Sequence, residues 1–168
     1  MDFSAFEHIA TALQNKFGEE IFEQINSEAV QPYVELKKDY LLQVCSFLYK
    51  EPEFYFDFLN CISAVDNGPE TGTLELWYHL SSIPNEKSFI IKVTVQRGDD
   101  HSLPEIDSLT PIWKTADWHE REAFDLVGVK FNQHPDLRRI LLPADWHGHP
   151  LRKDHVEQEK YHGIKVKY

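Results

Sequence analysis

The stretch Thr73–Gln96, TLELWYHLSSIPNEKSFIIKVTVQ, decides the fold. Large apolar residues occupy every second position in each half of it: Leu74, Leu76, Tyr78 and Leu80, then Phe89, Ile91, Val93 and Val95. A period of two is typical of a strand that buries one face. The residues between the halves, Ile83-Pro84-Asn85-Glu86, include the Pro and Asn of a turn. The stretch therefore predicts an antiparallel β-hairpin with one face in the core.

The segments on either side of the hairpin add helices to this sheet. The pattern before it predicts these elements in chain order: a helix at 3–17, strands at 20–26 and 32–37, a helix from a cap at Asp39 to before Pro52, a helical turn at 53–59 and a strand at 60–65. After it, a third helix is predicted over 112–127, following Pro111 and ending at Gly128. This order indicates an α+β fold, a single domain whose mixed or antiparallel sheet has helices packed on it.

Composition and charge narrow the class of protein. The 168 residues are 42% hydrophobic, which is enough for one domain with its own core. The net charge of −11 repels a phosphate backbone, so nucleic-acid binding is not expected. The excess of acid lies in residues 1–112, whose net charge is −12, while residues 113–168 carry +1. This asymmetry indicates that the last third faces something different from the rest.

The sequence predicts no signal peptide, no membrane span and no iron–sulfur cluster held by this chain alone. The acidic, amphipathic start of the chain is unlike a signal peptide. The longest aliphatic stretch, Phe89–Val95, is interrupted by Lys92 and is too short to span a bilayer. Cys45 and Cys61 are too few for an ordinary iron–sulfur cluster, which needs four thiolates, and we expect them to be buried and reduced.

The carboxy-terminal stretch has no pattern of its own. Residues 143–168 combine two Pro and two Gly with a run of charges, and their apolar residues show no period. Such a segment cannot form a core. We therefore expect two parts: an α+β domain over 1–129 that ends in the helix 112–127, and an extended, partner-binding tail over 130–168 that is disordered or ordered by another chain.

The helix 112–127 has two apolar stripes rather than one. At 100° per residue it sorts into three rows: Trp113, Glu120, Phe124 and Val127 on one side, Trp118, Glu122 and Leu126 on nearly the opposite side, and Asp117, Arg121 and Asp125 between them. An ordinary surface helix has one apolar stripe. Either both glutamates reach solvent and the charged row is solvated, or one stripe packs on the domain's sheet and the other on a second protein.

In the second hypothesis the two glutamates are paired, because a buried carboxylate without a partner shifts its pKa or destabilises the fold. The cations that lie nearby in sequence are Arg138, Arg139, Arg152 and Lys153. We expect Trp113 in the core with Phe124. Trp118 and Trp146 are expected on the partner surface, since Trp is enriched at the hot spots of interfaces.

The residues from Trp118 to Asp154 resemble a known family. The stretch 118–129, WHEREAFDLVGV, is similar to the Glu-Arg-Glu-x-x-Asp-apolar-apolar-Gly signature of the 30-kDa subunit of respiratory NADH dehydrogenase, which is the C subunit of bacterial complex I. The likeness continues through HPDLRRIL at 134–141 and DWHGHPLRKD at 145–154. A match over roughly forty residues with this many charged, Gly and Pro positions is far more specific than a lone motif.

The resemblance implies membership of the translocase NADH:quinone oxidoreductase, with no catalytic residue, metal or redox centre in this chain. NADH, FMN, iron–sulfur clusters and quinone would be bound by other subunits. The implied partners are the large quinone-site subunit and the iron–sulfur subunits of the peripheral arm. Through them the chain would be peripheral to the membrane, on the cytoplasmic side of the inner (plasma) membrane or the matrix or stromal side in organelles.

The positions that the resemblance implies for the partner interface are those of the matched stretch: Trp118, Glu120, Arg121, Glu122, Asp125, Gly128, His134, Pro135, Arg138, Arg139, Trp146, Gly148, Pro150, Leu151, Arg152, Lys153 and Asp154. Two alternatives stay open. Relatives of complex I that are linked to ferredoxin or hydrogenase use the same domain. A free-standing metal-dependent enzyme is the alternative from another class, because His147, His149 and His155 lie close to two aspartates in the sequence.

Overall fold

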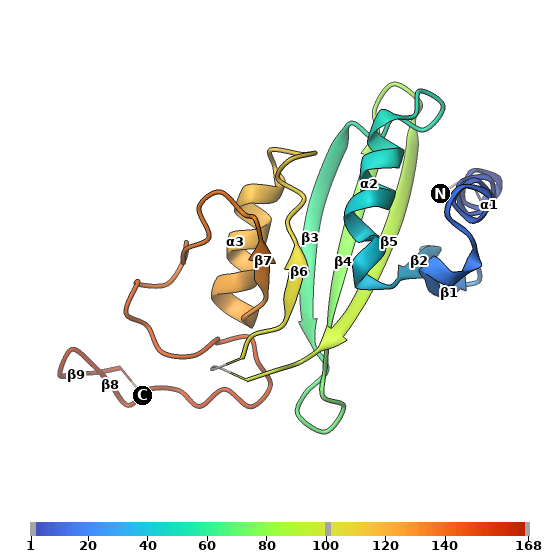
Figure 1. Cartoon of the computed structure of the whole chain (residues 1–168). Helices are drawn as coiled ribbons and strands as arrows, with labels where there is room; N and C mark the ends of the chain where they lie inside the picture. Colours follow the sequence, from blue (N-terminus) through green and yellow to red (C-terminus); the bar gives the residue numbers. More distant parts are fainter. Residues whose placement is uncertain (1–2, 100–101, 167–168) are drawn as a thin grey trace.

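The computed structural model describes residues 3–99 and 102–166, so the outermost residues of the two predicted parts, 1–2 and 167–168, lie outside the described residues (Figure 1). The helices are α1 (Phe3–Phe17), α2 (Leu41–Lys50) and α3 (Ala116–Val127), with 3-10 turns η1 (Glu19–Ile21) and η2 (Lys38–Tyr40). The strands are β1 (Phe22–Asn26), β2 (Tyr33–Leu36), β3 (Phe58–Asp66), β4 (Thr73–Ser82), β5 (Lys87–Gln96), β6 (Glu105–Asp107), β7 (Lys130–Asn132), β8 (Lys160–Tyr161) and β9 (Ile164–Lys165).

The predicted hairpin is present as strands β4 and β5, which pair from Thr73 opposite Gln96 to Ser82 opposite Lys87. It lies within a five-stranded sheet of order β1-β2-β5-β4-β3. Strands β2 and β5 run parallel, and the other neighbours run antiparallel. The alternating side chains of β4 from Leu74 to Leu80 are buried, as their period predicts. The α+β class with a mixed sheet is therefore confirmed.

The three helices are spread along this sheet (Figure 1). Helix α2 crosses its face, α1 lies at the end that carries β1 and β2, and α3 lies beside β3 at the other end. Leu13 of α1, Leu48 of α2 and Val127 of α3 belong to one continuous cluster of buried side chains. Each such aliphatic side chain contributes about 1.5–3 kcal/mol by its burial. Helix α3 is thus anchored by one of its sides at the edge of the sheet.

Three predicted boundaries differ from the structure. Helix α2 has Tyr40 as its N-cap and no side chain caps it, so the predicted cap at Asp39 is wrong. Residues 53–57 form a turn and irregular chain instead of a helical turn. Helix α3 begins at Ala116, four residues later than predicted, because the carbonyl oxygen of Leu109 accepts the N–H groups of Ile112 and Trp113 in a separate turn.

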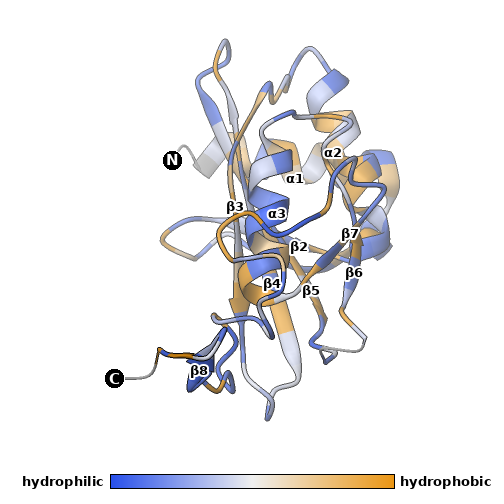
Figure 2. Ribbon diagram, turned by 90° about the vertical axis from the view of Figure 1, so that its left-hand side faces the viewer, coloured by the Kyte–Doolittle hydropathy of each residue, from blue (hydrophilic) through white to orange (hydrophobic). Residues whose placement is uncertain are grey.

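A second, parallel pair of strands has no counterpart among the predicted elements. Strands β6 and β7 pair with Ile106 opposite Phe131, and both side chains are buried. Because β7 follows α3 almost directly, it returns the start of the predicted tail to the domain. The hairpin β8–β9 stands apart from the sheet near the carboxyl end (Figure 1), and its strand β8 is hydrophilic (Figure 2). None of the helices in the described ranges has the length and apolar content needed to cross a bilayer.

Candidate docking site around α3

Helix α3 has one buried side and one exposed side. Trp113, in the turn before the helix, is 3% exposed and donates its indole N–H to the carbonyl oxygen of Phe56 over 2.9 Å, so its predicted place in the core is confirmed. On the opposite side Trp118 is 65% exposed, and Glu122 is exposed as well. Of the two stripes predicted for this helix, the one with Trp113 is therefore covered by the domain. The one with Trp118 is not covered by any of the described residues, and it is called the open stripe.

One residue of the charged row between the stripes, Asp125, is not solvated. Asp125 is fully buried, and its Oδ2 accepts three backbone N–H groups, at 3.0, 2.8 and 2.9 Å, from Ile140, Leu141 and Leu142. Its Oδ1 lies 2.7 Å from Nη1 of Arg139. Burial would raise the pKa of this carboxyl, but the three N–H groups and the guanidinium outweigh burial and hold the pKa below its usual value. The hypothesis of a solvated row is therefore wrong.

The end of α3 forms a second attachment point. Gly128 has a φ of +78°, and its N–H donates to the carbonyl oxygens of Ala123 and Phe124. A Cβ at this position would lie 2.5 Å from Cδ2 of His149, so only glycine fits. Arg152 is 7% exposed and donates its Nε–H to the carbonyl oxygen of residue 127 over 2.8 Å. A cation at the carboxyl end of a helix is favoured by the helix dipole.

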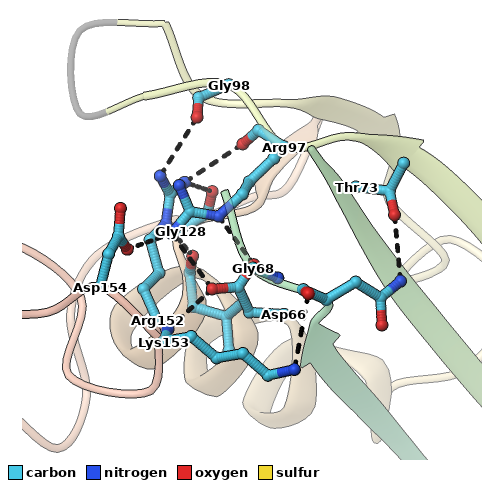
Figure 3. A network of polar contacts seen from close by, with 11 residues as sticks. Asp66, Gly68, Thr73, Arg97, Gly98, Gly128, Arg152, Lys153 and Asp154 are labelled. Atoms are coloured by element: carbon cyan, nitrogen blue, oxygen red, sulfur yellow. Dashed lines mark hydrogen bonds and ion pairs between the residues drawn. The ribbon is translucent and has the colours of Figure 1, made fainter. Parts of the chain in front are cut away.

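Next to Arg152, an ion network attaches residues 153 and 154 to the ends of β3 and β5 (Figure 3). Arg97 donates its Nε–H to Asp66 Oδ1 over 2.7 Å and an Nη2–H to Oδ2 over 3.1 Å, and it also pairs with Asp154. The backbone N–H of Lys153 donates to Asp66 Oδ2 over 2.7 Å. Burial would raise the pKa of Asp66, but Arg97 and the N–H of Lys153 lower it to about 2. Bidentate pairs of this kind fix geometry as well as charge.

Glu120, on the buried side of α3, has a hydroxyl and an amide as partners. Its side chain is fully buried, the hydroxyl of Ser108 donates to Oε2 over 2.6 Å, and the N–H of Leu109 donates to Oε1 over 2.7 Å. Within the described ranges no Lys or Arg forms an ion pair with it, so its predicted pairing with a nearby cation is wrong. Burial raises the pKa of Glu120 to about 7, against the lowering effect of these two hydrogen bonds.

These contacts correct the prediction that the tail is ordered only by another chain. Residues 130–155 are attached to the domain by β7, Arg139, Arg152 and Asp154. Sequence reasoning missed their partners Asp66, Arg97 and Ser108, which lie far from the matched stretch. One sequence signal was available, the carboxylate of Asp66 at the end of an apolar run. Hereafter the segment 130–155 is called the strap.

The matched residues thus divide into inward and outward groups. Those whose side chains or backbone join the strap to the domain are Arg121, Asp125, Gly128, His134, Arg138, Arg139, Leu151, Arg152, Lys153 and Asp154, whereas Glu120 bonds within the domain and Gly148 within the strap. Those that face outward without such a bond are Trp118, Glu122 and Pro135; the side chains of Arg138, Leu151, Lys153 and Asp154 are also exposed, while Trp146 and Pro150 are half-buried. Trp146 packs on the ring of Tyr161, with 5.5 Å between the ring centroids.

A groove runs along the exposed side between α3 and β3. Its volume is about 310 Å³, and it is lined by Glu122 and Leu126 of α3, Cys61 and Ala64 of β3 and Leu151 of the strap, among others. Leu151 is 59% exposed. In the described part of the chain, Glu122 forms no ion pair. The groove is therefore an apolar surface that carries an uncompensated carboxylate.

The histidines of the metal-enzyme alternative have other surroundings. His149 is buried, its ring lies 6.4 Å from that of Phe124, and its Nδ1 is 3.0 Å from the carbonyl oxygen of Asp125. His147 and His155 border the same cavity of about 510 Å³ as His149. Across residues 3–99 and 102–166, no group of three or more His, Cys, Asp or Glu side chains is arranged to hold a metal ion.

Comparison with known proteins places this geometry in a family. The sequence model described as "Respiratory-chain NADH dehydrogenase, 30 Kd subunit" matches residues 34–161, which include α3 and the whole strap. The chain belongs to this family. The C subunit of NADH-quinone oxidoreductase from Chloroherpeton thalassium is 41% identical over 157 residues, which are 93% of this chain and 63% of that protein. The C subunit from Chlorobium phaeobacteroides is 40% identical over 158 residues, 93% of this chain and 92% of that protein.

Another relative of this chain has a name that joins two subunits. The C/D subunit of NADH-quinone oxidoreductase from Yersinia pestis (strain Pestoides F) is 35% identical over 150 residues, 85% of this chain but 24% of that protein. Among solved structures, a trypsin-resistant fragment of Nqo5 is 26% identical with a TM-score of 0.61, over 78% of this chain and 98% of the fragment. A chain of an archaeal membrane-bound sulfane sulfur reductase shares the fold, with a TM-score of 0.65 at 20% identity, over 83% of this chain and 77% of that one.

Proposed function

We propose that this chain is the C subunit of a proton-translocating NADH:quinone oxidoreductase and that it supports the large quinone-site subunit without a redox centre of its own. Two relatives at about 40% identity carry the name of the C subunit. The name of the Yersinia protein, C/D, assigns two subunits to one polypeptide. The D half of that name is the large quinone-site subunit, so the name supports direct contact between that subunit and this chain. The chain would lie in the peripheral arm, on the cytoplasmic side of the inner membrane.

The observation that supports a docking surface on this chain is the open stripe of α3. Trp118 is a large apolar side chain at 65% exposure, and the groove beside it joins Leu126 and Leu151 to the carboxylate of Glu122. Buried Trp side chains dominate the binding energy of many interfaces. A carboxylate at the rim of an apolar surface selects a partner with a Lys or Arg at the matching position. The large quinone-site subunit is therefore proposed to cover this groove with an apolar side chain and a cation.

The strap widens this surface. Its exposed apolar residue Leu141 and, after it, Val156 and Ile164 are 62%, 80% and 69% exposed. A permanent interface buries on the order of 800 Å² per partner or more, which is larger than one helix face supplies. The proposal is therefore that the outer side of residues 130–166 continues the docking surface of α3, while the inner side of the strap holds it to the domain.

The test is recovery of the large quinone-site subunit with a tagged form of this chain extracted from membranes. The double variant Trp118→Ala, Glu122→Ala is expected to recover at least about tenfold less of that partner, because hot-spot truncations cost about 2 kcal/mol or more. The matched control is Ile83→Ala in the β4–β5 turn, where the side chain is equally exposed at 65%. Full recovery with the double variant, at an unchanged melting temperature of the free chain, would contradict the proposal.

A further inference from the structure

Three side-chain oxygens form a row in the interior between α3 and the loop that precedes it. Oε2 of Glu120 is 2.6 Å from Oγ of Ser108, which is 2.7 Å from Oγ1 of Thr110. The three residues are 0%, 2% and 5% exposed. Docking through the open stripe of α3 makes no use of this row, because Glu120 lies on the buried side of the helix. No Lys or Arg in the described ranges pairs with the buried carboxylate of Glu120, so keeping it ionised costs free energy.

We propose that Glu120, Ser108 and Thr110 form a reversible proton-binding site in which the two hydroxyls relay the proton to and from the glutamate. When Glu120 is ionised, Thr110 O–H donates to Ser108, and Ser108 O–H donates to the carboxylate. When Glu120 is protonated, both bonds reverse: the carboxyl O–H donates to Ser108, and Ser108 O–H donates to Thr110. Each hydroxyl releases one proton and receives one, so the net change is one proton bound at the carboxyl group.

Glu120 and Ser108 keep their hydrogen bonds in both states of this row. The N–H of Leu109 donates to Oε1 of Glu120 over 2.7 Å, and the N–H of Thr110 donates to Oγ of Ser108 over 3.1 Å. A hydroxyl can act as donor and acceptor at once, which allows the direction of the row to reverse without movement of the backbone. A site of this kind exchanges its proton at little structural cost, since neither state leaves the carboxyl group of Glu120 or the hydroxyl of Ser108 without a partner.

The ring of His134 lies beside the same carboxylate, with Nε2 also 3.5 Å from Oδ1 of Asp117. The backbone N–H of Asp136 donates to its Nδ1 over 3.0 Å, so that nitrogen carries no proton. The proton of the ring is therefore on Nε2, which lies 3.3 Å from the carbonyl oxygen of Asp117 and 4.0 Å from Oε2 of Glu120. A second proton on the ring would break the bond from Asp136. Nε2 of the imidazole thus lies nearer to the two oxygens of Asp117 than to Glu120.

The other titratable groups near Glu120 are acids. Asp117 on α3 raises the pKa of Glu120, after the larger effect of burial, and the pKa is about 7. Tyr78 of β4 is buried, and burial followed by the charge of Glu120 raises the pKa of its phenol. Cys45 of α2 lies close enough to Tyr78 to add to that rise. Since no Lys or Arg of the described ranges pairs with the glutamate and its pKa is about 7, both of its protonation states are populated near neutral pH.

The test is a carbon-13 titration of the carboxyl groups in the full chain labelled at glutamate. One signal is expected to have its midpoint near pH 7, to vanish in Glu120→Gln and to persist in Glu122→Gln, which changes an exposed carboxylate on the same helix. If every glutamate signal of the unsubstituted chain has its midpoint below about pH 5, as exposed glutamates do, the proton-binding site does not exist. This result needs no variant to fold.

Two hydroxyl variants test the relay separately. Ser108→Ala removes a donor to the carboxylate and should raise the midpoint by about one pH unit. Thr110→Val removes the acceptor that Ser108 O–H needs only when Glu120 is protonated, so it should lower the midpoint by a similar amount. Shifts of opposite sign support the reversible row. A midpoint that Thr110→Val leaves unchanged, or raises as Ser108→Ala does, would overturn the relay.

Discussion

Among single residues, the buried carboxylates around α3 differ in how their charge is balanced. Asp66 and Asp125 each accept backbone N–H groups and pair with an arginine, whereas Glu120 accepts one N–H and one hydroxyl. The pKa of each aspartate is therefore lowered, while that of Glu120 is raised. Asp66 stabilises the fold fully above pH 3.8, and this contribution is lost as the pH falls through about 2.

Replacement of Asp125 by alanine is expected to destabilise the protein by about 3–5 kcal/mol, because Arg139 and three N–H groups lose their common acceptor. The measurement is urea unfolding at pH 7. Asp136→Ala is the matched control, since Asp136 pairs only at the surface with Arg138, whose side chain is 71% exposed. Its free energy of unfolding should stay close to that of the unsubstituted chain. Equal losses in the two variants would contradict the role given to Asp125.

The raised pKa of Glu120 predicts that the protein becomes less stable as the pH rises, which is opposite to the effect of Asp66. Its pKa rises from the ordinary value of 4.5 to about 7 in the folded chain, so the folded state binds more protons between these values. The free energy of unfolding should therefore fall by about 3 kcal/mol as the pH rises from 4.5 to above 7. Urea unfolding across this range should show the fall in Glu122→Gln and a much smaller one in Glu120→Gln. Identical pH profiles in the two variants would refute this assignment.

At the scale of elements, the strap explains how a segment with few regular elements keeps a defined course. It is attached at Asp125 in the last turn of α3, at Gly128 where the helix ends, and at Asp66 and Arg97 where β3 and β5 end. Buried backbone N–H groups need acceptors, and carboxylates supply them here where a strand partner would in a sheet. The signature of the family is thus largely a set of intramolecular attachments.

Two truncations separate the strap from the hairpin that follows it. A chain that ends after His155 should keep its melting temperature to within a few degrees, because hairpin β8–β9 lies apart from the sheet. A chain that ends after Val129 should melt at least about 10 °C lower, since it loses β7 and the partners of Asp125 and Asp66. Circular dichroism measures both. Equal melting temperatures would instead favour the predicted division at residue 129.

At the scale of the whole molecule, local patterns were predictable and distant pairings were not. The hairpin, helix 3–17 and the end of α3 at Gly128 each depend on the period or conformation of neighbouring residues. The hydrogen bond from Lys153 to Asp66 joins residues 87 apart in the sequence, and the one from Arg97 to Asp154 joins residues 57 apart. No local sequence pattern could therefore predict these bonds. The two stripes of α3 were correctly separated, but the partners of Glu120 and Asp125 depend on the path of the strap.

In the assembled enzyme, the open stripe of α3 is expected to face the large quinone-site subunit. The most direct measurement is crosslinking in the intact membrane complex from a photoreactive amino acid at position 118, which reports the neighbour of that side chain. Position 83 serves as the equally exposed control. Position 118 should crosslink to the large quinone-site subunit, and position 83 should not. Crosslinking to that partner from position 83 alone, or from neither position, would contradict this arrangement.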